Sequence, residues 1–213
     1  MEQGSPSDTA FARDLKERLE AFLESRLAVL EATLHSCMDT LLWDPDLFER
    51  NLDQGIGEEG QALRLYQAIG NSQGVTSTMD SAVHIAVEEA AYALPRSVLF
   101  ETRKRVQSET TIREVEAWFV PLLSLLFQKL ATLLEDGSRF EVLLREDAVG
   151  STLELGLEGL HPESLEGALI IGEKTLLPLL ADILGLRSEN LSTDASDTLR
   201  VVIPIPASAY VLD

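Results

Sequence analysis

Apolar residues near the start of the chain recur at alternating spacings of four and three, which is typical of one face of an α-helix. The residues on this face are Leu23, Leu27, Leu30, Leu34, Cys37 and Leu41. The pattern predicts one helix from about residue 8 to residue 41, which at about 1.5 Å per residue would be roughly 50 Å long. Because a compact chain of this size does not need so long a helix alone, the pattern favours an antiparallel bundle or a dimer.

The next hundred residues also carry mainly helical signals. Gly55-Ile-Gly57 indicates a loop before a shorter helix at about 59–69. Ser77-Thr-Met-Asp80 has the form of an N-cap and predicts a helix to about residue 94, and Pro95 permits another to about residue 106. Thr111-Ile-Arg-Glu114 has the form of a capping box, so a further helix is expected directly after it.

That last helix is the most apolar in the chain, with an expected kink or restart at Pro121 and an end at Gly137. Beyond it the apolar period changes to two, which predicts a β-hairpin with one buried face around a turn at Asp147-Ala-Val-Gly150. The alternating apolar residues are Phe140, Val142, Leu144, Leu153, Leu155 and Leu157.

The chain is expected to close with a helix at about 173–184, capped by Gly185, then a polar turn at Ser188–Asp197 and a strand at 199–205. Helices first and a mixed helix-and-strand region afterwards predict an α+β fold. An N-terminal helical bundle would precede a small α/β sandwich.

The segment from Val115 to Pro206 resembles the ATP-binding domain of sensor histidine kinases in the order of its elements. An apolar helix (PLLSLLFQKLATLLEDG) precedes two strands (SRFEVLLRED and STLELGLEG), and a helix (KTLLPLLADILGL) precedes the closing strand (DTLRVVIPIP). The resemblance implies two domains, a helical dimerisation and histidine-phosphotransfer region at 1–107 and an ATPase-like domain at 108–213.

The residues that hold nucleotide in that family are missing here. The chain has no asparagine between Asn71 and Asn190, no Asp-x-Gly-x-Gly loop after the second strand, and Leu169-Ile-Ile-Gly-Glu-Lys174 where a glycine-rich lid is expected. Phosphate binding needs closely approaching backbone N–H groups and a metal ligand. The domain therefore resembles a degenerate, pseudo-kinase ATPase, and we expect no nucleotide or other cofactor.

A kinase-like chain that lacks the nucleotide-binding residues is similar to the bacterial histidine phosphotransferases. Those proteins join a dimeric four-helix bundle to a degenerate ATPase-like domain. The resemblance implies a homodimeric two-component or phosphorelay adaptor that docks response-regulator receiver domains, which would supply the Mg²⁺. The competing interpretation is a non-catalytic acidic homodimer that acts as a binding module, scaffold or chaperone.

Two histidines are candidates for phosphoryl transfer because each lies beside an apolar helix seam with an acid four residues later. They are His35, followed by Asp39, and His84, followed by Glu88. Either can equally be an ordinary surface residue with an intrahelical acid partner, and Ser36 stands where the family has an acid after its histidine. His161 precedes Pro162 and is expected in a loop.

Charge and composition exclude several functions. The 213 residues include 17 Lys and Arg against 36 Asp and Glu, a formal charge of −19 that would repel nucleic acid and anionic lipid. The one basic cluster, Arg103-Lys104-Arg105, is expected to decorate a helix end. A single cysteine, Cys37, excludes an internal disulfide, and no histidine lies near another at ligand spacing, so no metal site is expected. Without a signal sequence or apolar span, a cytoplasmic location is expected.

Overall fold

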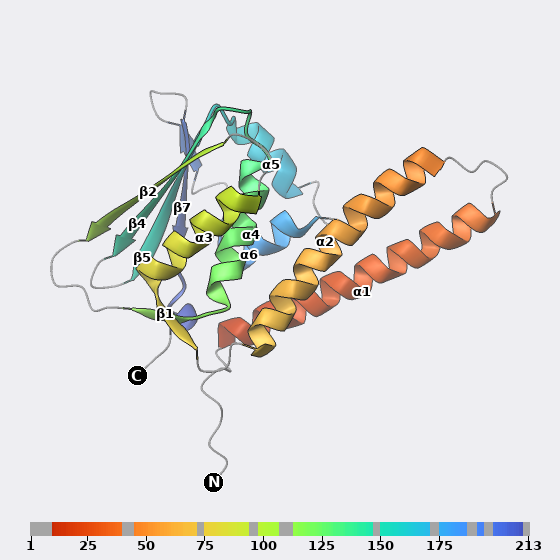
Figure 1. Ribbon diagram of the computed structural model, residues 1–213, viewed down its shortest axis with the longest axis horizontal. Helices are drawn as coiled ribbons and strands as arrows, with labels where there is room; N and C mark the ends of the chain where they lie inside the picture. The colour runs from red at the N-terminus through yellow and green to blue at the C-terminus, as the bar shows by residue number, and fades with distance from the viewer. Residues whose placement is uncertain are drawn as a thin grey trace, which may run out of the picture.

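The computed structural model describes residues 10–39, 45–71, 75–93, 98–106, 113–146, 150–170, 175–186, 191–193 and 198–210. It confirms the predicted α+β class. Two long helices form an antiparallel hairpin that projects from an α/β sandwich, in which helices cover one face of a sheet (Figure 1).

The hairpin consists of α1 (Ala10–Asp39) and α2 (Pro45–Asn71), so the long first helix is confirmed. Its buried residues lie at the end nearest the sandwich and recur at helical spacing: Phe11, Leu15, Leu19 and Phe22 from α1, and Ala62, Leu65 and Ile69 from α2. Of the predicted seam, Leu23 packs against this core, whereas Leu27 is 62% exposed, so the prediction is wrong at Leu27. The side chains from Val29 to Leu41 lie outside the described part.

Helix α2 runs through Gly55 and Gly57, so the loop predicted there is wrong. Glycine costs about 1 kcal/mol relative to alanine in a helix interior. Burial of Ala62 and Leu65 next to α1 offsets that cost, and Arg26 Nε lies 3.6 Å from Glu59 Oε1 across the two helices.

The sheet has five strands in the order β2-β4-β5-β7-β6. Their bounds are Leu99–Val106 for β2, Arg139–Glu146 for β4, Ser151–Glu158 for β5, Leu191–Thr193 for β6 and Thr198–Pro204 for β7. Strand β2 pairs in parallel with β4, and the other pairs are antiparallel. The predicted β4–β5 hairpin is confirmed, and its alternating apolar residues are all buried.

Four helices lie on one side of this sheet (Figure 1): α3 (Met79–Ala93), α4 (Phe119–Ala131), α5 (Pro162–Ile170) and α6 (Leu176–Ile183). Phe140 of β4 is fully buried and meets Phe127 of α4 edge-on, with ring centroids 5.8 Å apart. Phe100 of β2 stacks on the ring of Phe140, with ring centroids 5.0 Å apart. Aromatic contacts thus fix the edge strand and the central helix to one point of the core.

The helix predicted after Pro95 is wrong, because residues 99–106 form the edge strand β2. Phe100 and Glu101 pair with Phe140 and Glu141, so the inward and outward positions of the two strands match. A partner strand forty residues away supplies the backbone hydrogen bonds that decide between helix and strand. The cluster Arg103-Lys104-Arg105 therefore lies on a strand and not at a helix end.

The capping box predicted to start the most apolar helix is also wrong. Glu114, the last residue of the predicted capping box, begins the short strand β3 (Glu114–Glu116). This strand pairs antiparallel with β1 (Thr76–Thr78). Glu114 Oε2 accepts a hydrogen bond from Thr76 Oγ1 at 2.9 Å instead of capping a helix. Helix α4 begins at Phe119, so Pro121 lies in its first turn, where the missing N–H breaks no helical hydrogen bond.

The end of α6 agrees with the sequence. Gly185 has φ of +67°, its N–H donates to the carbonyl of Asp182, and the N–H of Leu186 donates to the carbonyl of Ala181 at 2.8 Å. These two bonds make a Schellman cap, which needs the left-handed conformation that glycine adopts without strain. The polar segment after it was predicted as a turn, but its residues Leu191–Thr193 form strand β6.

Residues before and after position 107 contribute to one sandwich, since β2 pairs with β4 and α3 packs along α4. The predicted domain boundary at 107/108 itself lies outside the described residues. No helix in the described ranges is long and apolar enough to cross a bilayer.

Candidate functional site

His84 lies on the exposed side of α3. The opposite side of this helix is buried through Met79, Ala82, Val83, Ala86, Val87 and Ala90. The small residues Ala82, Ala86 and Ala90, at every fourth position, allow α3 to lie close along α4. The helix that carries His84 is therefore held by the core.

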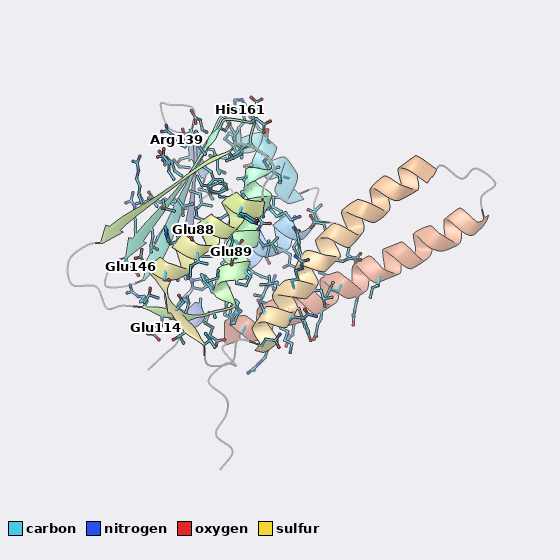
Figure 2. All side chains as sticks on the ribbon, in the orientation of Figure 1. Glu88, Glu89, Glu114, Arg139, Glu146 and His161 are labelled. Carbon is cyan, nitrogen blue, oxygen red and sulfur yellow. The ribbon has the colours of Figure 1, made fainter. Side chains whose placement is uncertain are left out.

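The imidazole of His84 is well placed for contact with another molecule. Its side chain is 64% exposed, and Nε2 lies 3.3 Å from Glu88 Oε1, one helical turn later. Glu88 and its neighbour Glu89, both labelled at α3 in Figure 2, are exposed. A carboxylate at this distance orients the imidazole ring.

Apolar side chains flank His84 on the same face. Helical spacing places Ile85 and Tyr92 beside His84 and Glu88, and both are exposed, Tyr92 to 94%. Ile85 and Tyr92 therefore add exposed apolar surface to the side of α3 that carries His84. We call the face formed by His84, Ile85, Glu88 and Tyr92 the His84 face.

The other two histidines are not part of this face. His35 lies within the backbone of α1, but its side chain lies outside the described residues, so its role stays a prediction. His161 is exposed, and its carbonyl accepts the N–H groups of Ser164 and Leu165 at the start of α5. In Figure 2 it lies far from Glu88. The described residues contain no group of three metal-ligating side chains.

A second polar cluster joins the hairpin to the sandwich, and no local sequence pattern predicted it. Glu58 of α2 pairs with Lys129 of α4 through Oε1, while its Oε2 accepts the N–H of Leu176 at 2.7 Å. Leu176 is the first residue of α6, and both charged side chains are only 17% exposed. Glu58 thus accepts a hydrogen bond from a free backbone N–H at the N-terminus of α6. This is the position at which backbone N–H groups and the helix dipole attract anions.

Trp118 and Phe119 are packing residues of the core. Both are buried, and Trp118 Nε1 donates to Glu116 Oε2 at 2.7 Å. Phe11 of α1 stacks on Trp118 with ring centroids 5.7 Å apart, which ties the start of the hairpin to the core.

No protein-family model matches the chain, and no curated protein matches it. Among solved structures, it is similar to the Acinetobacter baumannii histidine kinase AdeS, at 11% identity and a TM-score of 0.49, over 86% of this chain and 95% of that one. It is also similar to the mycobacterial sensor histidine kinase MprB, at 14% identity and a TM-score of 0.42, over 61% of this chain and 96% of that one.

A third similar structure is the histidine kinase ThkA in complex with the response regulator protein TrrA. The identity is 12% and the TM-score 0.39, over 91% of this chain and 61% of that one. Because all three TM-scores are below 0.5, these likenesses do not assign an activity to the chain.

Proposed function

We propose that this chain is a two-component or phosphorelay adaptor that docks receiver domains and works without nucleotide. The observation that carries the proposal is the chain's own topology. Helix α4, strands β4 and β5, helix α6 and strand β7 follow one another in the order of the histidine kinase ATPase domain, and the long α1–α2 hairpin precedes them.

The His84 face supports the transfer step. The unprotonated ring nitrogen would attack the phosphorus of a receiver's phosphoaspartate, forming an N–P bond while the acyl phosphate P–O bond breaks. The receiver's carboxylate would leave, and the Mg²⁺ that the receiver supplies would neutralise charge on the transferred group. Glu88 would stabilise the resulting cationic phosphoimidazole, and the step reverses towards a second receiver.

The Glu58 cluster supports independence from nucleotide. An ATP phosphate would need cationic groups and helix N–H donors near α4 and α6. Lys129 and the N–H of Leu176 already bind the carboxylate of Glu58, so an incoming phosphate would have to displace it.

Phosphoryl transfer tests the proposal directly. Receiver domains labelled with ³²P-phosphoaspartate are mixed with the full chain and Mg²⁺, and acid-labile, alkali-stable label on the chain is measured. We expect label that is lost in His84→Ala or, if the α1 histidine is the acceptor, in His35→Ala. His161→Ala is the matched control, since it removes another exposed histidine and should keep the label.

A chain that never takes label, or that keeps it in both candidate variants, contradicts the relay proposal and favours the binding-module alternative. An ATP titration is the second arm. Saturation in the micromolar range would contradict the proposed independence from nucleotide.

A further inference from the structure

The sheet face that the helices leave uncovered carries a groove lined by arginines. Its volume is about 400 Å³, within the range of roughly 300–1,000 Å³ typical of small-molecule sites. Arg103 of β2, Arg145 of β4 and Arg200 of β7 line it, and Leu143 and Val202 supply apolar surface. Three separate strands thus bring guanidinium groups to one hollow.

Gly156 on the central strand makes this arrangement possible. Glu141 of β4 and Arg200 of β7 are its neighbours in register on either side, and they form an ion pair of 2.8 Å across it. A Cβ atom at Gly156 would lie 2.6 Å from Arg200 Nη1 and 3.2 Å from Glu141 Oε2. The missing side chain therefore allows Arg200 to lie flat over the sheet.

The groove is positive within a strongly acidic molecule. Three arginines line it against two glutamates, Glu141 and Glu154, so its lining carries one net positive charge. Glu141 is approached by Arg200 at 2.8 Å, by Arg103 at 3.9 Å and by Arg139 at 4.0 Å. Arg103 and Arg139 each lie nearer to Glu101, at 3.3 Å, so Arg200 is the main partner of Glu141.

Donors also remain for a ligand. Among the described residues, Nε of Arg145 is buried and has no hydrogen-bond partner, while its Nη2 binds Glu154 at 2.7 Å. Arg103 is 64% exposed, and a guanidinium offers five N–H donors. Because that Nε is buried, the donors within reach of a ligand in the groove are those of the exposed Arg103.

We propose that this groove binds a compact phosphorylated small molecule. Forked guanidinium groups match the terminal oxygens of a phosphate, and Leu143 and Val202 would contact the apolar part of the ligand. The charge of −19 opposes long polyanions such as nucleic acid, but a compact anion inside the groove interacts mainly with the nearby arginines.

Calorimetric titration of the full chain with pyrophosphate tests the site. We expect saturable binding with Kd below about 1 mM, and a loss of about tenfold in Arg103→Gln, which removes one charge-assisted contact. Arg139→Gln is the matched control, because Arg139 lies on the same face and contacts the same Glu141 but does not line the groove. It should change the affinity by less than about twofold.

Val202→Trp adds a second variant that fills the groove without altering its charge, and it should abolish binding while thermal unfolding shows a folded chain. Two outcomes overturn the proposal: no saturable binding of pyrophosphate with Kd below about 1 mM, or equal losses of affinity in Arg103→Gln and Arg139→Gln. The result is independent of phosphoryl transfer, since His84 lies on α3, on the opposite side of the sheet.

Discussion

Individual side chains connect segments of this chain that are distant in sequence. Glu58 reaches Leu176, Arg200 reaches Glu141, and Tyr66 of α2 donates its hydroxyl to Glu20 of α1 at 2.5 Å. Single substitutions at these contacts should therefore have defined, local effects.

Tyr66 gives a pH-dependent prediction. Its hydrogen bond to Glu20 raises the pKa of the Tyr66 hydroxyl above its ordinary value near 10, because ionisation would break the bond and place two negative charges together. Since the folded pKa is the higher one, this contact stabilises the fold fully below about pH 10 and is lost as pH rises through the folded pKa.

In Glu20→Gln the pKa of Tyr66 should fall towards the ordinary value, as measured by NMR titration of ¹³Cζ-labelled tyrosine. Glu89→Gln, which removes an exposed carboxylate from α3, is the control and should leave the Tyr66 titration unchanged. An unchanged Tyr66 titration in Glu20→Gln would show that the hydrogen bond does not persist in solution.

At the scale of elements, the contact between α2 and α6 depends on Glu58. Glu58→Ala should lower the free energy of unfolding by about 2 kcal/mol, because it removes an N-terminal helix acceptor and leaves Lys129 partly buried without its partner. Glu58→Gln keeps an acceptor and should cost about 1 kcal/mol.

Hydrogen exchange at the Leu176 amide distinguishes this contact from general loosening of the hairpin. Exchange should accelerate in Glu58→Ala but not in Glu59→Ala, whose carboxylate pairs with Arg26 within the hairpin. Equal acceleration in both variants would mean that α6 does not depend on Glu58.

Elements whose signals are local could be predicted from the sequence, and elements decided by distant partners could not. The β4–β5 hairpin has period-two apolar residues around a short turn, and Gly185 marks the end of α6. Strand β2 was predicted as a helix because its partner β4 begins forty residues later, at Arg139 opposite Leu99. Pairing with β4 then outweighs local preference.

The same distinction applies to the candidate sites. The exposure of His84 and its Glu88 partner could be predicted, because both follow from positions on one helix. The Glu58 cluster and the arginine groove could not, because each joins residues from elements more than forty positions apart. The spacing of residues along the sequence does not indicate such contacts.

At the scale of the whole molecule, the dimer remains a prediction with a clear test. Leu27 is exposed on the part of α1 beyond the sandwich contact, so a second copy could cover it. Light scattering should give twice the chain mass of 23.4 kDa, and Leu27→Glu should shift the protein towards monomer. Because each copy carries a charge of −19, association should strengthen with added salt.

Val75→Glu is the matched control, since it adds the same charge at another exposed apolar residue, outside the hairpin. A mass of 23.4 kDa for the unsubstituted chain, or equal dissociation by both variants, would contradict a dimer formed through α1.

The parallel pairing of β2 with β4 also limits how the molecule can be cut for study. A fragment that started at residue 108 would keep β4, β5 and β7 but lose the edge strand and α3, uncovering Phe140 and one side of α4. Such a fragment should aggregate through its open edge. A fragment intended to keep the sandwich would need to start before Thr76, so that β1 and α3 are included.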